Sequence, residues 1–247
     1  MNIIIPLAGI SNFDSENNFY PIPLRDVYKK PLIQYVVENL LGIKGKNKFI
    51  FILKEDDCLK FHLDNTLKLL TPNCEIVILK NKTAGSVCSI LMAIDKINMS
   101  ADTIVVNADQ IFKSDINTYV DYFRDNSADA GVITFDSVHP RWSYVKCDKN
   151  GNILQAVEKN PISRFAIAGF YYFKSFNDFK LSAFNSLEVE DYYNESLYTS
   201  ALINQMILLN KKVLNKVINP QDYMSFYSAQ KINEFERYIS ENNYICN

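Results

Sequence analysis

A single carboxylate, Asp109, stands directly after a short apolar run, in the sequence Asn107-Ala108-Asp109-Gln110. The run has the composition of a strand, and in an open parallel sheet ligands bind at the carboxyl ends of the strands. A carboxylate at that edge supplies the hard oxygen donor that Mg²⁺ prefers, and Mg²⁺ can bridge the oxygens of a bound triphosphate. A turn or helix-capping Asp fits the same position equally well. Position alone therefore leaves metal binding and capping evenly matched.

Small residues occupy two other places where a nucleotide could approach the backbone. Pro6 to Ser11 follow the first apolar run, and backbone amides between small residues can donate to phosphate. Thr83 to Ser86 precede a helical pattern, where Gly85 could admit a flat base. The structural alternatives are an ordinary turn at Gly9 and an N-cap at Ser86. Neither place predicts nucleotide binding by itself.

A charged pair, Glu158-Lys159, lies at the end of a predicted strand and before Pro161. Its carboxylate and ammonium could hold the polar groups and the phosphate of an acceptor molecule. Neighbouring Glu and Lys residues are common on solvated surfaces, and that explanation is the better one for this pair taken alone. The pair becomes informative only together with other motifs.

Strand-like and helical segments alternate through the first half of the chain, which predicts βα units and a mainly parallel sheet. In the second half the predicted strands follow one another closely, and Lys149-Asn150-Gly151 carries the Asn-Gly signal of a hairpin turn, so that this half is expected to be antiparallel. Strands are predicted at Asn2 to Pro6, Lys48 to Leu53, Glu75 to Leu79, Thr103 to Asn107, Gly131 to Phe135, Trp142 to Asp148, Asn152 to Glu158, Ala166 to Phe173 and Lys212 to Ile218. Helices are predicted at Pro31 to Leu41, Ser86 to Ile97, Ser196 to Asn210 and Gln221 to Ser240.

Composition and charge exclude several classes of protein. The chain of 247 residues has a formal net charge of −2, which gives no general attraction for nucleic acid. No apolar run approaches the roughly 20 residues that cross a bilayer, and no secretory signal begins the sequence, so we expect a cytoplasmic protein without membrane contact. The five scattered cysteines are expected to be reduced, and the two histidines lack ligand-type neighbours at zinc spacing. Any metal should therefore be bound by oxygen, while the oligomeric state stays open.

Taken together and in this order, the motifs resemble the sugar-nucleotidyltransferase family. The resemblance covers nearly the whole chain and implies one Rossmann-like α/β domain over residues 1–247, of glycosyltransferase-A type. Its mixed, mainly parallel sheet would be flanked by helices, with residues 1–135 binding nucleotide and residues 136–247 binding the acceptor. The motifs that carry the resemblance are Met1 to Gly9, Tyr20 to Leu24, Lys30 to Ile33, Thr83 to Ser86, Asn107 to Gln110, His139 to Tyr144, Glu158 to Ser163 and Gly169 to Phe173.

This resemblance implies a magnesium-dependent reaction in which a phosphate oxygen of the acceptor attacks the α-phosphorus of a nucleoside triphosphate and pyrophosphate leaves. Such catalysis rests on aligning two phosphates and stabilising charge, without a covalent intermediate. Asp109 would hold the metal, and Lys30, Asp109 and Lys159 would be catalytic. The residues implied to bind nucleotide are Leu7, Ala8, Gly9, Thr83, Gly85, Ser86 and Asn107, and those implied to bind the acceptor are Arg141, Glu158, Lys159, Arg164 and Gly169.

The chain departs from the family pattern at four places. Its first loop reads Gly9-Ile10-Ser11-Asn12-Phe13, without the second Gly and the Arg that grips the triphosphate. Ile22 replaces the Lys between the two prolines of the next motif, which makes Lys30 the candidate for the missing positive charge. Ala84 replaces a Gln, and the late Asp that supplies a second metal ligand aligns near Lys216.

Within the family, the chain is most similar to cytidylyltransferases that join CTP to glutamine phosphorylated on its side-chain amide and form CDP-glutamine for capsular phosphoramidate synthesis. In Asn194 to Tyr198, Ser196 stands at the position of the Glu that accompanies ordinary hexose-phosphate acceptors in relatives, which supports an unusual acceptor. The main alternative is a sugar-1-phosphate nucleotidyltransferase that uses CTP, UTP or dTTP. A non-catalytic nucleotide-binding module is a second alternative because of the missing Arg and Lys. A glycosyltransferase is disfavoured, since Asn107-Ala108-Asp109 stands in place of an Asp-x-Asp motif.

Overall fold

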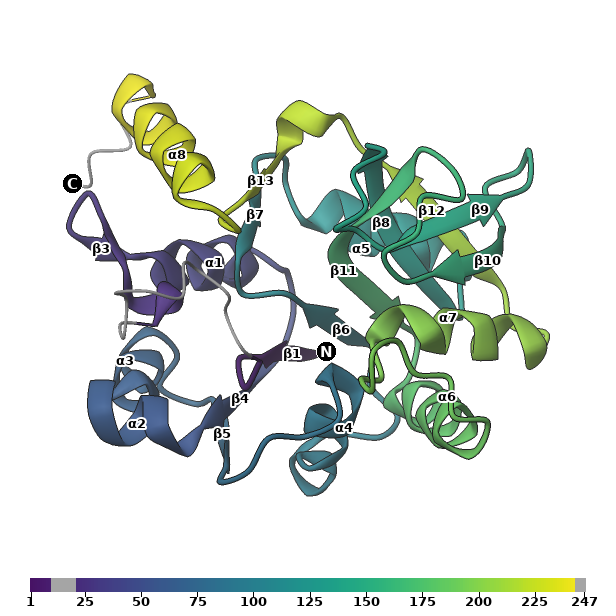
Figure 1. Ribbon diagram of the computed structural model, residues 1–247, viewed down its shortest axis with the longest axis horizontal. Helices are drawn as coiled ribbons and strands as arrows, with labels where there is room; N and C mark the ends of the chain where they lie inside the picture. Colours follow the sequence, from purple (N-terminus) through teal and green to yellow (C-terminus); the bar gives the residue numbers. More distant parts are fainter. Residues whose placement is uncertain (10–20, 243–247) are drawn as a thin grey trace.

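A nine-stranded sheet runs through the molecule in the computed structural model, which describes residues 1–9 and 21–242 (Figure 1). Its strands are β1 (Asn2–Pro6), β4 (Lys48–Lys54), β5 (Glu75–Leu79), β6 (Thr103–Val106), β8 (Ala130–Asp136), β9 (Tyr144–Cys147), β10 (Ile153–Val157), β11 (Phe165–Phe173) and β12 (Val213–Val217). The order is β10-β9-β11-β6-β1-β4-β5, with β8 beside β11 and β12 beside β8. Strands β6, β1, β4 and β5 are parallel, whereas β11 is antiparallel to β6, β8 and β9. The predicted α/β class is confirmed.

The first strand shows how the sheet is buried on both faces. Ile3, Ile4 and Ile5 are all fully buried, and successive side chains of a strand point to opposite faces. Ile3 and Ile5 pack into one apolar cluster, and Ile4 packs into a second. A continuous run of β-branched residues is typical of a parallel strand that is covered on both sides.

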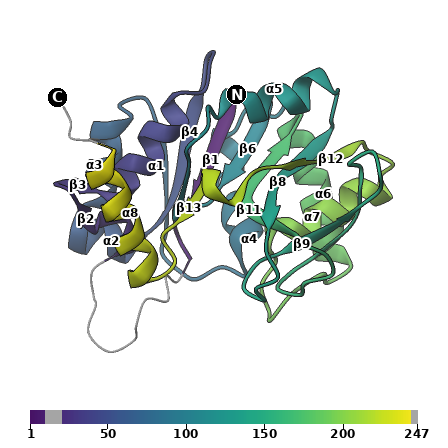
Figure 2. The same ribbon diagram turned by 90° about the horizontal axis from the view of Figure 1, so that it is seen from above.

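Helices supply the cover for both faces (Figures 1 and 2). The first cluster receives side chains from α1 (Leu32–Leu41), α2 (Glu55–Phe61), α3 (Leu63–Leu70), α5 (Asn117–Asp125) and α8 (Ala229–Glu241). The second receives them from α4 (Ser86–Leu91), α6 (Phe176–Glu188) and α7 (Thr199–Leu208). Helices α6 and α7 pack side by side in both views. Among the described residues, no helix has the length and apolar character that a bilayer crossing needs.

The hairpin predicted at the Asn-Gly sequence is confirmed. Strands β9 and β10 pair antiparallel, and Gly151 has a φ of 81°, which favours glycine. The carboxylate of Asp148 accepts hydrogen bonds from the backbone N–H groups of Asn150 (2.8 Å) and Asn152 (2.9 Å). This Asx-type arrangement stabilises the turn that joins the two strands.

Two predicted helices differ from the structure. The helix predicted from Ser86 to Ile97 ends at Leu91. A 3₁₀ turn (Ile94–Lys96), with its tighter hydrogen bonds between residues three apart, follows it. The helix predicted from Gln221 begins only at Ala229, with Ser228 as its N-cap. Residues before it form a 3₁₀ turn (Pro220–Asp222) and β13 (Tyr223–Ser225), which pairs with β7 (Gln110–Phe112). Helices α2, α3, α5 and α6 were not predicted.

Candidate functional site

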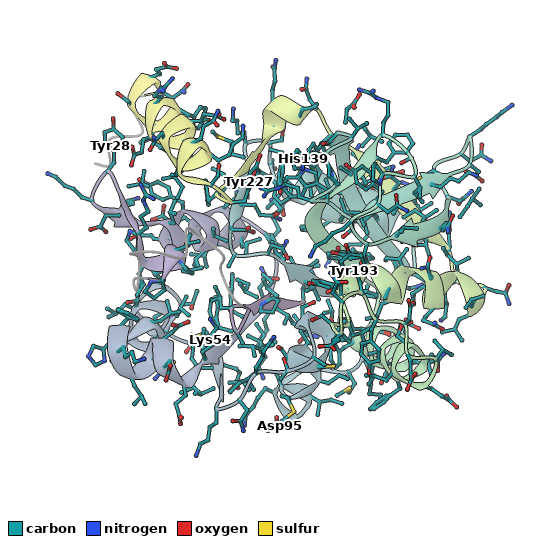
Figure 3. The ribbon with its side chains drawn as sticks, in the orientation of Figure 1. Tyr28, Lys54, Asp95, His139, Tyr193 and Tyr227 are labelled. Carbon is teal, nitrogen blue, oxygen red and sulfur yellow. The ribbon has the colours of Figure 1, made fainter. Side chains whose placement is uncertain are left out.

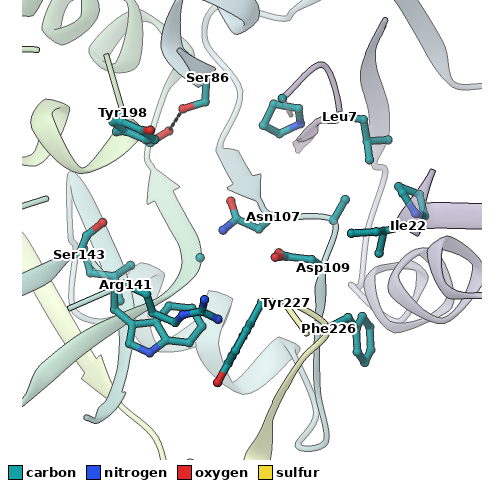
Figure 4. A pocket seen from close by; sticks show the side chains of 18 of the residues that line it. Leu7, Ile22, Ser86, Asn107, Asp109, Arg141, Ser143, Tyr198, Phe226 and Tyr227 are labelled. Carbon is teal, nitrogen blue, oxygen red and sulfur yellow. Dashed lines mark hydrogen bonds between the residues drawn. The ribbon is translucent and has the colours of Figure 1, made fainter. Parts of the chain in front are cut away.

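A cavity of about 680 Å³ lies where β1, β4 and β6 end (Figure 4). Both halves of the chain line it, and the described lining residues fall into two groups. Those before residue 135 are Pro6, Leu7, Gly9, Pro21, Ile22, Pro23, Lys54, Asp57, Ser86, Asn107, Ala108 and Asp109. Those after it are Arg141, Trp142, Ser143, Glu158, Lys159, Ile167, Gly169, Tyr171, Tyr198, Thr199, Phe226 and Tyr227.

Asp109 lies between β6 and β7, with its carboxylate facing the cavity (Figure 4). It does not cap a helix, so the capping explanation is wrong. Its carbonyl oxygen accepts a hydrogen bond of 2.7 Å from the backbone N–H of Phe226. The surrounding protein raises the pKa of the Asp109 carboxyl by desolvation, although a hydrogen bond from its own backbone and the positive charge of Arg141 act in the opposite direction. The residue is open to the cavity yet surrounded by protein, as a ligand-binding carboxylate would be.

A bend in β11 brings Gly169 against the residues that flank Asp109. The β11–β8 register shifts between Ile167 and Tyr171, and Gly169 has a φ of 58°. Its carbonyl oxygen accepts hydrogen bonds of 3.0 Å from the Asn107 backbone and from the Gln110 side chain. A Cβ atom at position 169 would lie 2.5 Å from the Asn107 side-chain nitrogen. Gly169 is therefore required for the packing of the Asp109 loop.

Gly85 has a structural role that differs from the one predicted. Its φ is 99°, and a Cβ atom there would lie 2.4 Å from the carbonyl oxygen of Leu197. The backbone of Leu197 crosses at this point and bonds to Ala84 (2.9 Å) and Val87 (3.2 Å). The close approach that requires glycine is thus made by the chain itself. Ser86 lines the cavity as the first residue of α4, and Gly85 is the N-cap.

Glu158 and Lys159 are half-buried in the cavity wall and do not form a solvated pair. The Oε2 atom of Glu158 accepts hydrogen bonds from the hydroxyls of Ser143 and Ser200, the latter at 2.6 Å. Lys159 has a φ of 51°, and its Nζ lies 3.4 Å from the Tyr198 hydroxyl. The same ammonium lies 5.2 Å from the ring centroid of Tyr193 and 4.9 Å from that of Tyr198. Aromatic faces thus hold a positive charge in the cavity wall.

Several residues assigned by resemblance lie outside the cavity lining. Lys30 pairs with Glu38 at 3.1 Å, and Arg164 pairs with Asp136 at 2.6 Å with 70% of its side chain exposed. The hydroxyl of Thr83 bonds to the carbonyl oxygen of Gly85 (3.2 Å) and to the Ser89 hydroxyl (2.6 Å), which stabilises the loop before α4. Ala8 packs against the second apolar cluster. Within the assigned set, the described lining contains Leu7, Gly9, Ser86, Asn107, Asp109, Arg141, Glu158, Lys159 and Gly169.

The family alignment places a second metal ligand near Lys216, but a later segment of the chain approaches Asp109. Lys216 lies in β12 with its ammonium 4.6 Å from the ring centroid of Tyr122, and it does not line the cavity. Phe226 and Tyr227 occupy the neighbourhood of Asp109 instead. Among residues 1–9 and 21–242, no three His, Cys, Asp or Glu side chains gather where they could hold a metal ion together.

Sequence reasoning missed Lys54, Asp57, Tyr198 and Tyr227. Lys54 follows a predicted strand directly, so the rule that singled out Asp109 could have found it. It lies at the end of β4, away from Tyr193 (Figure 3). Burial raises the pKa of Asp57, in the first turn of α2, against the effect of the Lys54 charge. Tyr198 ends the Asn194 to Tyr198 motif, which drew attention only to its missing Glu, and Tyr227 lies in a connecting segment that no local motif marks.

The cavity lies at the carboxyl ends of parallel strands, which is where open α/β sheets bind their ligands. A family model described as nucleotidyl transferase matches residues 20–219. This match covers far more than half of the chain, and the chain belongs to the nucleotidyl transferase family.

Two solved structures share the fold. The nucleoside-diphosphate-sugar pyrophosphorylase from Vibrio cholerae RC9 has a TM-score of 0.79 and 20% identity, and the match covers 95% of this chain and 99% of that one. The inositol-1-phosphate CTP transferase from T. maritima has a TM-score of 0.76 and 12% identity, with 97% and 94% covered. Among curated proteins, a glucose-1-phosphate adenylyltransferase from Ruminiclostridium cellulolyticum is 31% identical over 96 residues, which are 37% of this chain and only 22% of that protein.

Proposed function

We propose that the chain is a magnesium-dependent cytidylyltransferase that joins CTP to a small phosphorylated acceptor. The observation that carries the proposal is the distribution of charged groups around one cavity. Asp109 and Lys54 come from the first half of the chain, whereas Arg141 and Lys159 come from the second. Membership of the family supports nucleotidyl transfer, and the T. maritima neighbour, which is described as a CTP transferase, supports the choice of base.

In the proposed reaction a phosphate oxygen of the acceptor attacks the α-phosphorus of CTP. The new P–O bond forms as the bond to the bridging oxygen breaks, and pyrophosphate leaves with the electron pair. Arg141 and Lys159 would hold the acceptor phosphate, because a guanidinium fork and an ammonium both bind phosphate oxygens. Lys54 would hold the triphosphate, since it is the one Lys or Arg among the described lining residues of the first half. Alignment of the two phosphates supplies much of the catalysis.

Asp109 fits the role of magnesium ligand. It is a carboxylate open to the cavity, and desolvation raises its pKa, so that a nearby cation would stabilise its ionised form. The described residues offer no cluster of further ligands, and water and substrate phosphate oxygens would therefore complete the coordination. When bound, the ion would offset negative charge on the phosphoryl oxygens.

Two acceptors suit the second half of the cavity. Glutamine phosphorylated on its amide carries an ammonium and a carboxylate besides its phosphate, and Glu158 and Lys159 offer the complementary charges. Only the Oε2 atom of Glu158 accepts hydrogen bonds from described hydroxyls, which leaves Oε1 for an ammonium. A sugar 1-phosphate is equally well supported, since the Vibrio neighbour is named for a nucleoside-diphosphate sugar and the adenylyltransferase relative for glucose 1-phosphate.

Pyrophosphate release across a grid of substrates tests the proposal. The purified chain would be given Mg²⁺ and each of CTP, UTP, dTTP and ATP, in combination with amide-phosphorylated glutamine or with sugar 1-phosphates. We expect release with CTP and phosphorylated glutamine. Release with sugar 1-phosphates alone would replace the glutamine acceptor, and preference for another triphosphate would replace CTP. Binding of CTP without release in any combination would make the chain a nucleotide-binding module.

A further inference from the structure

Arg141 lines the cavity with a guanidinium group that makes no ion pair with a described residue. Its Cζ lies 3.4 Å from the centroid of the Tyr227 ring and 5.9 Å from that of Trp142. The N–H donors of a guanidinium lie in its plane, so an aromatic ring on its face leaves the donors at its edge available. Arg164 offers a contrast, because its guanidinium is already paired with Asp136 outside the cavity.

Trp142 holds the Tyr227 ring in place. The two rings meet edge to face, with their centroids 5.6 Å apart and an angle of 79° between their planes. Trp142 makes similar contacts with Phe135 (5.3 Å, 85°) and Tyr223 (5.9 Å, 70°). Such contacts add about 0.5–1.5 kcal/mol each beyond the area they bury. The ring beneath Arg141 therefore belongs to a packed aromatic group.

The backbone connects this aromatic group to Asp109. The N–H of Phe226 donates to the carbonyl oxygen of Asp109 at 2.7 Å, and Tyr227 is the next residue (Figure 4). This bond continues the pairing of β13 with β7 by one step, since Ser225 lies opposite Gln110. The position of the Tyr227 ring is thus tied to that of the Asp109 loop.

We infer that Tyr227 is a positioning residue that holds the Arg141 guanidinium against the phosphate of the acceptor. This role belongs to the face of its ring, because the Tyr227 hydroxyl forms no hydrogen bond with a described residue. The inference rests on the proposed function for the identity of the acceptor, whereas the anion site itself can be tested without turnover.

Steady-state kinetics with a double-mutant cycle test the inference. Tyr227→Leu should raise the KM for the phosphorylated acceptor roughly five- to thirty-fold, the range for loss of a desolvated cation–π contact, with less effect on the KM for CTP. Tyr227→Phe should stay within about two-fold of the wild type, since it keeps the ring. In an Arg141→Ala background, Tyr227→Leu should add nothing further, because the two residues act as a unit.

A matched control uses a second cation–aromatic pair. The ammonium of Lys113 lies 4.3 Å from the ring centroid of Tyr238, which lies in α8 and does not line the cavity. Tyr238→Leu removes the same kind of side chain and should leave the acceptor KM unchanged. Loss of acceptor affinity in both variants would mean that Tyr227 acts only through stability, and would overturn the inference.

A fluorescence titration separates this inference from the proposed function. Trp142 is the single Trp of the sequence, and it contacts the Tyr227 ring, so it reports on this position. Inorganic phosphate and pyrophosphate should change its emission in the wild type, with weaker binding in Tyr227→Leu and none in Arg141→Ala. This result would support the anion site even if no substrate released pyrophosphate. No phosphate-dependent change in the wild type, or equal binding by Tyr227→Leu, would overturn the inference.

Discussion

Asp109 is a residue whose environment opposes the charge that its proposed role requires. Desolvation raises the pKa of its carboxyl, and the Arg141 charge counteracts only part of this effect. When a carboxyl has a higher pKa in the folded than in the unfolded state, the unfolded state loses its proton first as the pH rises. Ionisation of Asp109 therefore lowers the free energy of unfolding at neutral pH, unless a cation binds.

Replacing Asp109 by Asn should separate activity from stability. We expect Asp109→Asn to abolish magnesium-dependent pyrophosphate release, while its thermal midpoint at neutral pH equals or exceeds that of the wild type without Mg²⁺. The difference should vanish as the pH falls below the unfolded pKa of Asp, about 3.9, because both side chains are then neutral. Circular dichroism melts at several pH values would measure it. Normal activity in this variant would remove Asp109 from the mechanism.

Lys159 is the second residue whose role can be isolated. Its ammonium lies in the cavity wall near two tyrosine rings, on the side assigned to the acceptor. Lys159→Ala should raise the KM for the acceptor about ten-fold or more and change the KM for CTP much less, since a charged hydrogen bond contributes about 1.5–3 kcal/mol. Lys149→Ala, at the exposed β9–β10 turn, is the control. An unchanged acceptor KM would contradict the assignment.

The bend in β11 acts at the scale of an element, because it sets the position of the whole Asp109 loop. Gly169→Ala combines strain at a φ of 58° with contacts of 2.5 Å to the side chains of Asn107 and Gln110. We expect it to lower the free energy of unfolding by more than the roughly 1–3 kcal/mol of backbone strain alone, and to lower turnover as well.

Gly45→Ala is the matched control for this prediction. Gly45 has a φ of 96°, but no atom lies within 4 Å of the Cβ position, so the substitution carries the strain without the collision. Urea unfolding of the two variants would compare them. Equal losses of stability, with normal turnover in Gly169→Ala, would show that the contacts with Asn107 and Gln110 affect neither the free energy of unfolding nor turnover.

At this same scale the sequence predicts the strands better than the late helices. Ile3 to Ile5 form an apolar run that needs burial on both faces, and this local requirement locates β1. Residues 223–225 instead join a strand because β7 lies beside them, and no local pattern records that distant pairing. The site residues also divide into those that a local sequence pattern identifies and those that only the fold brings together. Asp109 and Lys54 could be found at strand ends, whereas Tyr227 reaches Arg141 only through the fold.

At the scale of the whole molecule, the charged residues that line the cavity come from both halves of the chain. Lys54 lies at the end of β4, and it makes no ion pair with a described residue. We expect Lys54→Ala to raise the dissociation constant of CTP about ten-fold or more while the acceptor KM stays within about two-fold, because a hydrogen bond to a charged group contributes about 1.5–3 kcal/mol. Calorimetric titration with CTP measures the first effect. Lys60→Ala, an exposed residue of α2, provides the control.

A proportional loss of acceptor binding in Lys54→Ala would contradict this division of labour. The cavity would then act as a single electrostatic site, and the assignment of its two sides would have to be abandoned.

The hydrogen bond between Phe226 and Asp109 affects when the site can form during synthesis of the chain. The Asp109 loop is synthesised before strands β8 to β12, yet the segment that braces it and carries Tyr227 follows β12 in the sequence. During translation the sheet strands up to β12 would leave the ribosome first, and the arrangement of Tyr227 against Arg141 would be complete only after β13 pairs with β7. The proposed phosphate site would thus form only after the segment that carries Tyr227 has been made.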